Sequence, residues 1–154
     1  MTALEPNRGK GQLYGRFSVR ARFNATARGY KTAWLLWPDS GIWPGGGEID
    51  WPEGNIPGAP TAFAHWASAT GGQDAFSQTA SGTTWHTYTT EWSPGKIVFL
   101  LDGAVVGTST KLVPATPMHW VLQCETELGS TAVIPAAATV ATIDIDWITM
   151  ATKA

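Results

Sequence analysis

The feature that most constrains the fold of this chain is how often glycine and proline interrupt it. Seventeen glycines and ten prolines are spread through 154 residues, and no stretch shows a long amphipathic helical pattern. Between them lie short runs rich in β-branched and aromatic residues, in which apolar and polar side chains alternate. This pattern predicts an all-β sandwich or barrel. No repeat or linker divides the sequence, so we expect residues 1–154 to form a single domain.

Several segments carry the strand pattern. The clearest is 14–23, where Phe17, Val19, Ala21 and Phe23 fall on one face and arginines alternate with them on the other. The segment 31–37 is apolar on both faces, which predicts a central strand. The other predicted strands are one that begins at residue 48, then 61–68, 86–92, 96–101, 104–109, 118–127 and 139–150. A tight turn at residues 102–103 and a loop at 135–139 are also expected.

Charge and composition limit the classes of partner. The formal net charge is −2, which offers no electrostatic basis for binding nucleic acid. Seven of the ten Lys and Arg residues precede residue 32, and the solvated face of one strand accounts for them better than a basic patch does. No apolar run approaches the ~20 residues of a membrane span, and the N-terminus lacks a signal-peptide pattern. The single cysteine, Cys124, excludes an internal disulfide.

Tryptophan is unusually frequent in this chain. Nine tryptophans exceed what a core of this size needs, although a Trp-rich core is the simplest interpretation. Flat aromatic faces also stack on the apolar faces of sugar rings. We therefore favour a mixture, in which some tryptophans fill the core and others form a binding surface.

Three of the twelve acidic residues lie within the segment 48–53, EIDWPE. Glu48 and Asp50 are two apart and therefore point to the same face of a strand. Glu53 would point to the opposite face of a regular strand, but one extra residue, a β-bulge, restores its parity. Pro52 favours a bulge, because proline cannot donate a ladder hydrogen bond. The sequence therefore predicts three carboxyl groups on one face.

Carboxyl groups held this close raise at least one pKa, which suits a site that needs one acid ionised and another protonated. Retaining glycoside hydrolysis has this requirement, since a nucleophile attacks the anomeric carbon while an acid protonates the leaving oxygen. Roughly 13 Å separates the Cα atoms of Glu48 and Glu53 in a bulged strand, so side chains leaning together can reach the ~5–5.5 Å spacing of retaining enzymes. Spacing alone also allows a Ca²⁺ site or a solvated acidic patch.

The segment 47–53 resembles the E-x-D-x-x-E signature of family 16 glycoside hydrolases, which include laminarinases and lichenases. The resemblance extends in order along nearly the whole chain. The further matching segments are YGRF at 14–17, AWLL at 33–36, GIWP at 41–44, HTYTTEW at 86–92, KIVFLLDG at 96–103 and DIDWI at 144–148. The resemblance implies a concanavalin-like β-jelly roll of two curved antiparallel sheets, with a glycan cleft on the concave side.

By position, the resemblance implies that Glu48 is the nucleophile, Glu53 the general acid/base, and Asp50 a residue that hydrogen-bonds the nucleophile. The spacer between Asp50 and Glu53 is similar to that of the laminarinase-like branch. The resemblance as a whole implies a secreted, retaining, endo-acting hydrolase of β-1,3- or mixed β-1,3-1,4-glucan that requires no cofactor. Two alternatives stay open at this point, a transglycosylase using the same carboxylates and a non-catalytic glycan-binding jelly-roll module.

The resemblance also implies a set of substrate-binding residues. Trp43 is expected to be a sugar-stacking platform, although a structural role fits His65 and a core position fits Trp92 equally well. The candidates are Trp43, His65, Trp66, Trp92, Gln123 and Glu125. Trp34 is expected in the core.

The sequence departs from the family pattern in two places. Trp51-Pro52 replaces a small or aliphatic pair, which would shift Glu53. The recognisable pattern begins near Tyr14, where family members usually have several preceding strands, so we expect the jelly roll to lack some N-terminal strands. A sheet edge exposed in this way would promote self-association. A structural calcium site that draws on both chain ends in the family cannot be assigned here.

Overall fold

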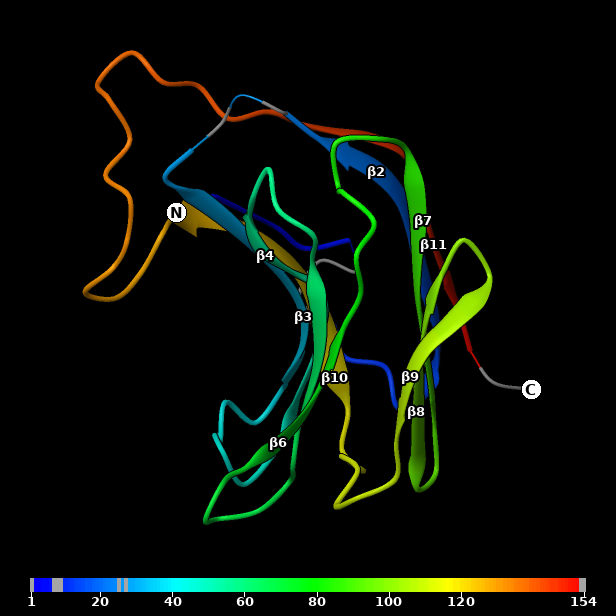
Figure 1. The fold of residues 1–154 in the computed structure, drawn as a ribbon. Helices are drawn as coiled ribbons and strands as arrows, with labels where there is room; N and C mark the ends of the chain where they lie inside the picture. Colours follow the sequence, from blue (N-terminus) through cyan, green and yellow to red (C-terminus); the bar gives the residue numbers. More distant parts are fainter. Residues whose placement is uncertain (1, 7–9, 25, 27, 153–154) are drawn as a thin grey trace.

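The computed structural model describes residues 2–6, 10–24, 26 and 28–152, which form two antiparallel sheets (Figure 1). The first sheet has six strands in the order β1-β10-β3-β4-β5-β6. These are β1 (Thr2–Leu4), β3 (Tyr30–Pro38), β4 (Glu48–Ile56), β5 (Thr61–His65), β6 (Gln73–Ser77) and β10 (Met118–Thr126). Strand β3 bows toward the other sheet, so the outer face of the first sheet is concave (Figure 1).

The second sheet has five strands in the order β11-β2-β7-β8-β9. These are β2 (Gly15–Phe23), β7 (His86–Ser93), β8 (Lys96–Leu101), β9 (Ala104–Ser109) and β11 (Ile143–Ala151). The prediction of an all-β jelly roll of two curved antiparallel sheets is confirmed. The described part of the chain has no helix long and apolar enough to cross a membrane.

Most strand predictions agree with the structure to within a few residues, and the hairpin strands 96–101 and 104–109 agree at both ends. The strand predicted at 61–68 ends at His65, and the one predicted at 139–150 begins at Ile143. Two strands were not predicted. β1 is three residues long, and β6 alternates exposed and partly buried residues at the edge of its sheet, so neither has a strong apolar pattern.

The hydrophobic core lies between the two sheets. Alternation along β2 buries Phe17, Val19, Ala21 and Phe23 to 4% exposure or less, as predicted. The tryptophans are divided between core and surface. Trp34, Trp51, Trp92 and Trp120 are buried, whereas Trp43 and Trp147 are 51% and 38% exposed.

The basic residues of β2 lie on the outer face of the second sheet, where each is paired with an acid. Arg16 contacts Glu91 at 2.9 Å, and Arg20 and Arg22 contact Asp146 and Asp144 at 2.6 and 2.8 Å. These pairs agree with a solvated strand face rather than an unpaired basic patch.

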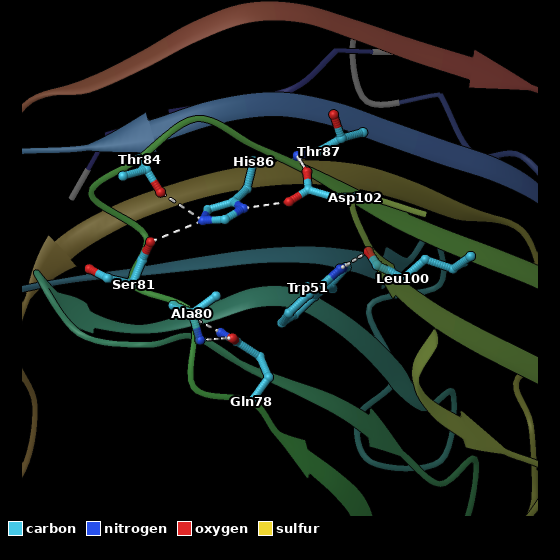
Figure 2. Close-up of polar contacts among 9 residues, drawn as sticks. All are labelled: Trp51, Gln78, Ala80, Ser81, Thr84, His86, Thr87, Leu100 and Asp102. Atoms are coloured by element: carbon cyan, nitrogen blue, oxygen red, sulfur yellow. Dashed lines mark hydrogen bonds and ion pairs between the residues drawn. The ribbon is translucent and has the colours of Figure 1, made fainter. Parts of the chain in front are cut away.

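Strand β4, which carries the three carboxylates, is fastened to the second sheet by Trp51. Its indole Nε1 donates a hydrogen bond to the carbonyl oxygen of Leu100 at 2.9 Å (Figure 2). The Trp51 ring also packs edge-on against Tyr88, with centroids 5.3 Å apart. The hydrogen bond of the indole and its aromatic contact hold Trp51 in the core, and they thereby fix the position and orientation of this part of β4 relative to the second sheet.

The β7–β8 hairpin supports that contact. Asp102 accepts hydrogen bonds from the backbone N–H of Thr87 at 2.7 Å and lies 2.6 Å from Nδ1 of His86 (Figure 2). Nε2 of His86 is 2.9 Å from Oγ1 of Thr84. Asp102 of the predicted 102–103 turn therefore ties β7 to the end of β8, next to Leu100.

Candidate active site

The predicted bulge is present in β4, and it assembles the site. Between Asp50 and Glu53, β4 advances three residues while each neighbouring strand advances two. The extra residue keeps Glu53 on the outer face with Glu48, while Ile49 and Trp51 enter the core at 1% and 2% exposure. The Trp51-Pro52 pair therefore does not take Glu53 out of the site.

The strand reaches this position through a turn that only glycine fits. Gly47 has a φ of 71°, and a Cβ there would lie 2.7 Å from the Pro114 ring and 2.9 Å from the carbonyl oxygen of His65. A larger residue would clash and would also strain the backbone. Gly47 thus sets where Glu48 begins the strand.

A cavity of about 370 Å³ lies on the outer face of the first sheet, where β10, β3, β4 and β5 run side by side. Both glutamates of the bulged segment line it. The full lining is Lys31, Ala33, Leu35, Trp37, Glu48, Glu53, His65, Val121, Gln123 and Glu125. A concave pocket with convergent polar groups is the usual form of a ligand site.

Glu48 and Asp50 form a closely coupled pair at one end of this cavity. Burial, and then the charge of Asp50, raise the pKa of Glu48 from 4.5 to about 8, although His65 and a hydrogen bond from Trp43 partly offset this. Burial and then the charge of Glu53 raise the pKa of Asp50 well above its usual range. Nε2 of His65 lies 3.0 Å from Oδ2 of Asp50, whose side chain is 1% exposed. The pair therefore retains a proton at neutral pH.

Glu53 has a different environment. Its Oε1 lies 3.0 Å from Nζ of Lys31, and the two side chains are 22% and 18% exposed. Lys31 is directly opposite Glu125 of β10 in the strand register, and Glu125 accepts a hydrogen bond from Nε2 of Gln123 at 2.8 Å. The two glutamates of the signature thus have contrasting neighbours, a buried acid for Glu48 and a cation for Glu53.

Four of the predicted substrate-binding residues lie at the cavity. His65, Gln123 and Glu125 line it. Trp43 is not part of the lining but adjoins it, since its ring centroid is 6.2 Å from that of His65 and its side chain hydrogen-bonds Glu48, and half of its surface is exposed. An exposed aromatic ring beside the carboxylates is well placed to stack on a sugar.

The structure does not bring the other two to the cavity. Trp92 is 1% exposed, and its Nε1 donates to the carbonyl oxygen of Pro114 at 3.0 Å, because alternation along β7 points it into the core. Trp66 follows His65 and its ring packs instead on Lys111, with Nζ 3.5 Å from the ring centroid. Of the two positions left open for Trp92, the structure has the core one, and Trp66 lies outside the cavity because successive residues in extended chain face opposite ways.

Among the residues of this face that were not predicted, three carry a charge or an aromatic ring. Lys31 and Trp37 line the cavity, and Phe63 stacks on His65 with centroids 6.2 Å apart. Parity along the predicted strand 31–37 places Lys31 and Trp37 on one face with Ala33 and Leu35. This parity identifies Lys31 and Trp37, but the apolar residues on both faces of the segment obscure it.

Ligand atoms of Glu48, Asp50 and His65 lie within 4.8 Å of one another, a spacing that could hold a metal ion. The imidazole makes this donor set a poor match for calcium, which prefers oxygen ligands. The calcium site of the family draws on the chain ends, and residues 1, 7–9 and 153–154 lie outside the described residues. The absence of a cofactor requirement stays a prediction.

Comparison with known proteins gives two findings at the level of sequence. No curated protein sequence matches this chain. The sequence profile of glycosyl hydrolases family 16 matches residues 7–149.

Solved structures share the fold at low identity. One comes from work on endo-acting O-glycanases with which human gut bacteria initiate mucin breakdown, with a TM-score of 0.79, 20% identity and 97% of this chain covered. The catalytic domain of an endo-1,3-β-glucanase (laminarinase) from Thermotoga petrophila has a TM-score of 0.73 and 20% identity over 96% of this chain. The Bacillus licheniformis β-glucanase has a TM-score of 0.73 and 19% identity over 94% of this chain. This chain covers 61%, 66% and 68% of those three chains, respectively.

Proposed function

The chain belongs to glycosyl hydrolase family 16, and from this premise we propose that it cleaves β-linked glucan internally, with retention of anomeric configuration. The observation that carries the proposal is the bulge that places Glu48 and Glu53 on one face of one cavity. The laminarinase and β-glucanase neighbours support a β-1,3- or mixed β-1,3-1,4-glucan as substrate. A polymeric substrate also supports an extracellular location.

In the proposed reaction, a Glu48 oxygen attacks the anomeric carbon while the Glu53 carboxylic acid donates its proton to the leaving glycosidic oxygen. The carbon–oxygen bond to the leaving sugar breaks as the Glu48 ester forms. Glu53, now ionised, takes a proton from a water molecule, and the resulting hydroxide displaces Glu48 from the sugar. Each group ends the cycle in its starting state.

Glu48 must be ionised for the first step, so we place the proton of the coupled pair on Asp50. Asp50 is the more deeply buried of the two, at 1% exposure, and burial disfavours its charged form more strongly. A protonated Asp50 can donate to Glu48, and the Trp43 side chain supplies a second hydrogen bond to it. Both bonds orient the attacking carboxylate.

A panel of polysaccharides tests the proposal. The purified protein is incubated with laminarin, lichenan, agarose and xyloglucan, and newly formed reducing ends are measured. We expect reducing ends from laminarin or lichenan, and none when Glu48 is replaced by glutamine. Mass spectrometry of reactions with added oligosaccharides would detect lengthened products if a sugar rather than water resolves the intermediate. Binding of a polymer without any cleavage would instead identify a glycan-binding module.

Trp43 provides a prediction about binding. Trp43→Ala is expected to raise KM for polymeric glucan more than it lowers kcat, because the exposed ring stacks on bound sugar while the hydrogen bond from Asp50 still orients Glu48. By analogy with base stacking, the loss is on the order of 1–3 kcal/mol. Steady-state kinetics on the polymer measure it, with Trp147→Ala, an exposed tryptophan of the second sheet, as the matched control. An unchanged KM would assign Trp43 a structural role.

A further inference from the structure

Lys31 is the one described lysine or arginine that lines the cavity, and it makes a close contact with the proposed acid/base. Its Nζ is 3.0 Å from Oε1 of Glu53, with both side chains about four-fifths buried. Ion pairs at the surface contribute little, but partial burial reduces the screening of this one.

The strand register explains why the cation lies here. In β3, Lys31 is followed on the same face by Ala33, the direct partner of Glu53. Ala33 is too small to reach across, so the long Lys31 side chain has room to extend over it to the glutamate. Glu125, the residue opposite Lys31 on β10, accepts a hydrogen bond from Nε2 of Gln123 at 2.8 Å.

Apart from Lys31, the titratable groups around Glu53 are three carboxyl groups and a histidine that contacts one of them. Glu48 and Asp50 come from its own strand and Glu125 comes from β10, while His65 of β5 lies beside Asp50 at 3.0 Å. Without a cation, this surrounding charge would oppose ionisation of Glu53. Lys31 provides the opposing interaction.

The reaction makes contrary demands on this residue. Glu53 must be protonated when it acts as acid and ionised when it acts as base, and an adjacent ammonium group favours only the ionised form. We propose that Lys31 is a positioning residue that fixes the Glu53 carboxyl in the cavity and favours its ionised form. It thereby promotes the base step relative to the acid step. This inference rests on the function proposed above.

The direction of the expected pH effect follows from the charge. The alkaline limb of kcat/KM reports loss of the proton from the acid in the free enzyme. Removing the ammonium group makes that proton harder to lose, so the limb moves to higher pH. An opposite charge at this distance shifts such a limb by about one pH unit.

Three variants test the proposal on the full chain. Lys31→Met keeps most of the apolar stem but removes the charge, Lys31→Arg retains the charge, and Lys96→Met removes an exposed lysine of β8 outside the site. Thermal unfolding confirms that each is folded. We expect the alkaline limb on natural glucan to move up by about one unit in Lys31→Met alone. A folded Lys31→Met with an unmoved limb, or a limb that moves equally in Lys31→Arg, would overturn the proposal.

A second readout does not depend on activity. In protein labelled with ¹³C at the glutamate carboxyl carbon, the Glu53 signal is assigned by its absence in Glu53→Gln and then titrated. Its midpoint is expected to rise by about one pH unit in Lys31→Met. An unchanged midpoint would overturn the proposal even if glucan is cleaved. A raised midpoint in a protein that cleaves no glucan would refute the proposed function and still establish the effect of Lys31 on Glu53.

Discussion

Replacing Glu48 with glutamine is expected to abolish turnover of every glycan and aryl glycoside, with a loss of at least about 10⁴ in kcat. The amide is a poor nucleophile, so the covalent intermediate cannot form, whatever the leaving group. Reducing-sugar release and chromogenic assays measure the loss, with Glu91→Gln as control because that carboxyl is exposed on the second sheet, away from the cavity. A Glu48→Gln protein that keeps a tenth of the activity would exclude Glu48 as nucleophile.

The same substitution is expected to make the protein more stable at alkaline pH. Burial and the charge of Asp50 raise the pKa of Glu48 to about 8 from 4.5, so between these values the folded Glu48–Asp50 pair holds a proton that the same two groups release in the unfolded chain. The resulting penalty is absent below pH 4.5, grows as the pH rises, and is complete above about 8. Glutamine does not ionise and avoids it.

Thermal unfolding from pH 5 to pH 9 checks this expectation. The Tm advantage of Glu48→Gln over the native protein should widen with rising pH. Glu91→Gln, which removes an exposed carboxylate paired with Arg16, serves as control and should show no such trend. A constant difference across the range would mean that placing Glu48 beside Asp50 does not cost stability through a retained proton. Together, the two results would identify a carboxylate kept at the expense of stability for its chemistry.

Glu53→Ala is expected to have a large effect that depends on the leaving group. On natural glucan, which needs its glycosidic oxygen protonated, kcat/KM should fall by roughly 10²–10⁴. Formation of the intermediate from an aryl glycoside with a good leaving group needs little proton donation and should be largely spared. Added azide should then restore turnover, because it attacks the intermediate without a general base.

The contrast between substrates is what identifies the acid/base. Equal losses on natural and activated substrates, together with no rescue by azide, would show that Glu53 has another role. The control is Glu91→Gln, which changes an exposed carboxyl group of the second sheet and should leave the ratio of the two activities unchanged.

The bulge in β4 could be predicted because its causes are local. The parity of Glu48, Asp50 and Glu53 and the missing N–H of Pro52 all follow from residues adjacent in sequence. The hairpin of β8 and β9 was predicted to the residue for the same reason, since its turn and its alternation lie within one short segment.

Cross-strand partners could not be predicted in this way. The contact between Lys31 and Glu53 joins residues 22 positions apart and depends on the register of β3 against β4. The core position of Trp92 follows from parity along β7, which the family resemblance did not take into account. Self-association through an exposed edge stays a prediction, and the edge strands of the described sheets are β1, β6, β9 and β11.

The stereochemistry of the first product tests the central claim most directly. Proton NMR of a β-glucan digest, recorded before mutarotation, resolves the α- and β-anomeric signals of the new reducing end. If Glu48 attacks the anomeric carbon and water then displaces it, the β-anomer forms first and the α-anomer appears only later. If the α-anomer forms first, water attacks the sugar directly, and the assignment of Glu48 as nucleophile is contradicted.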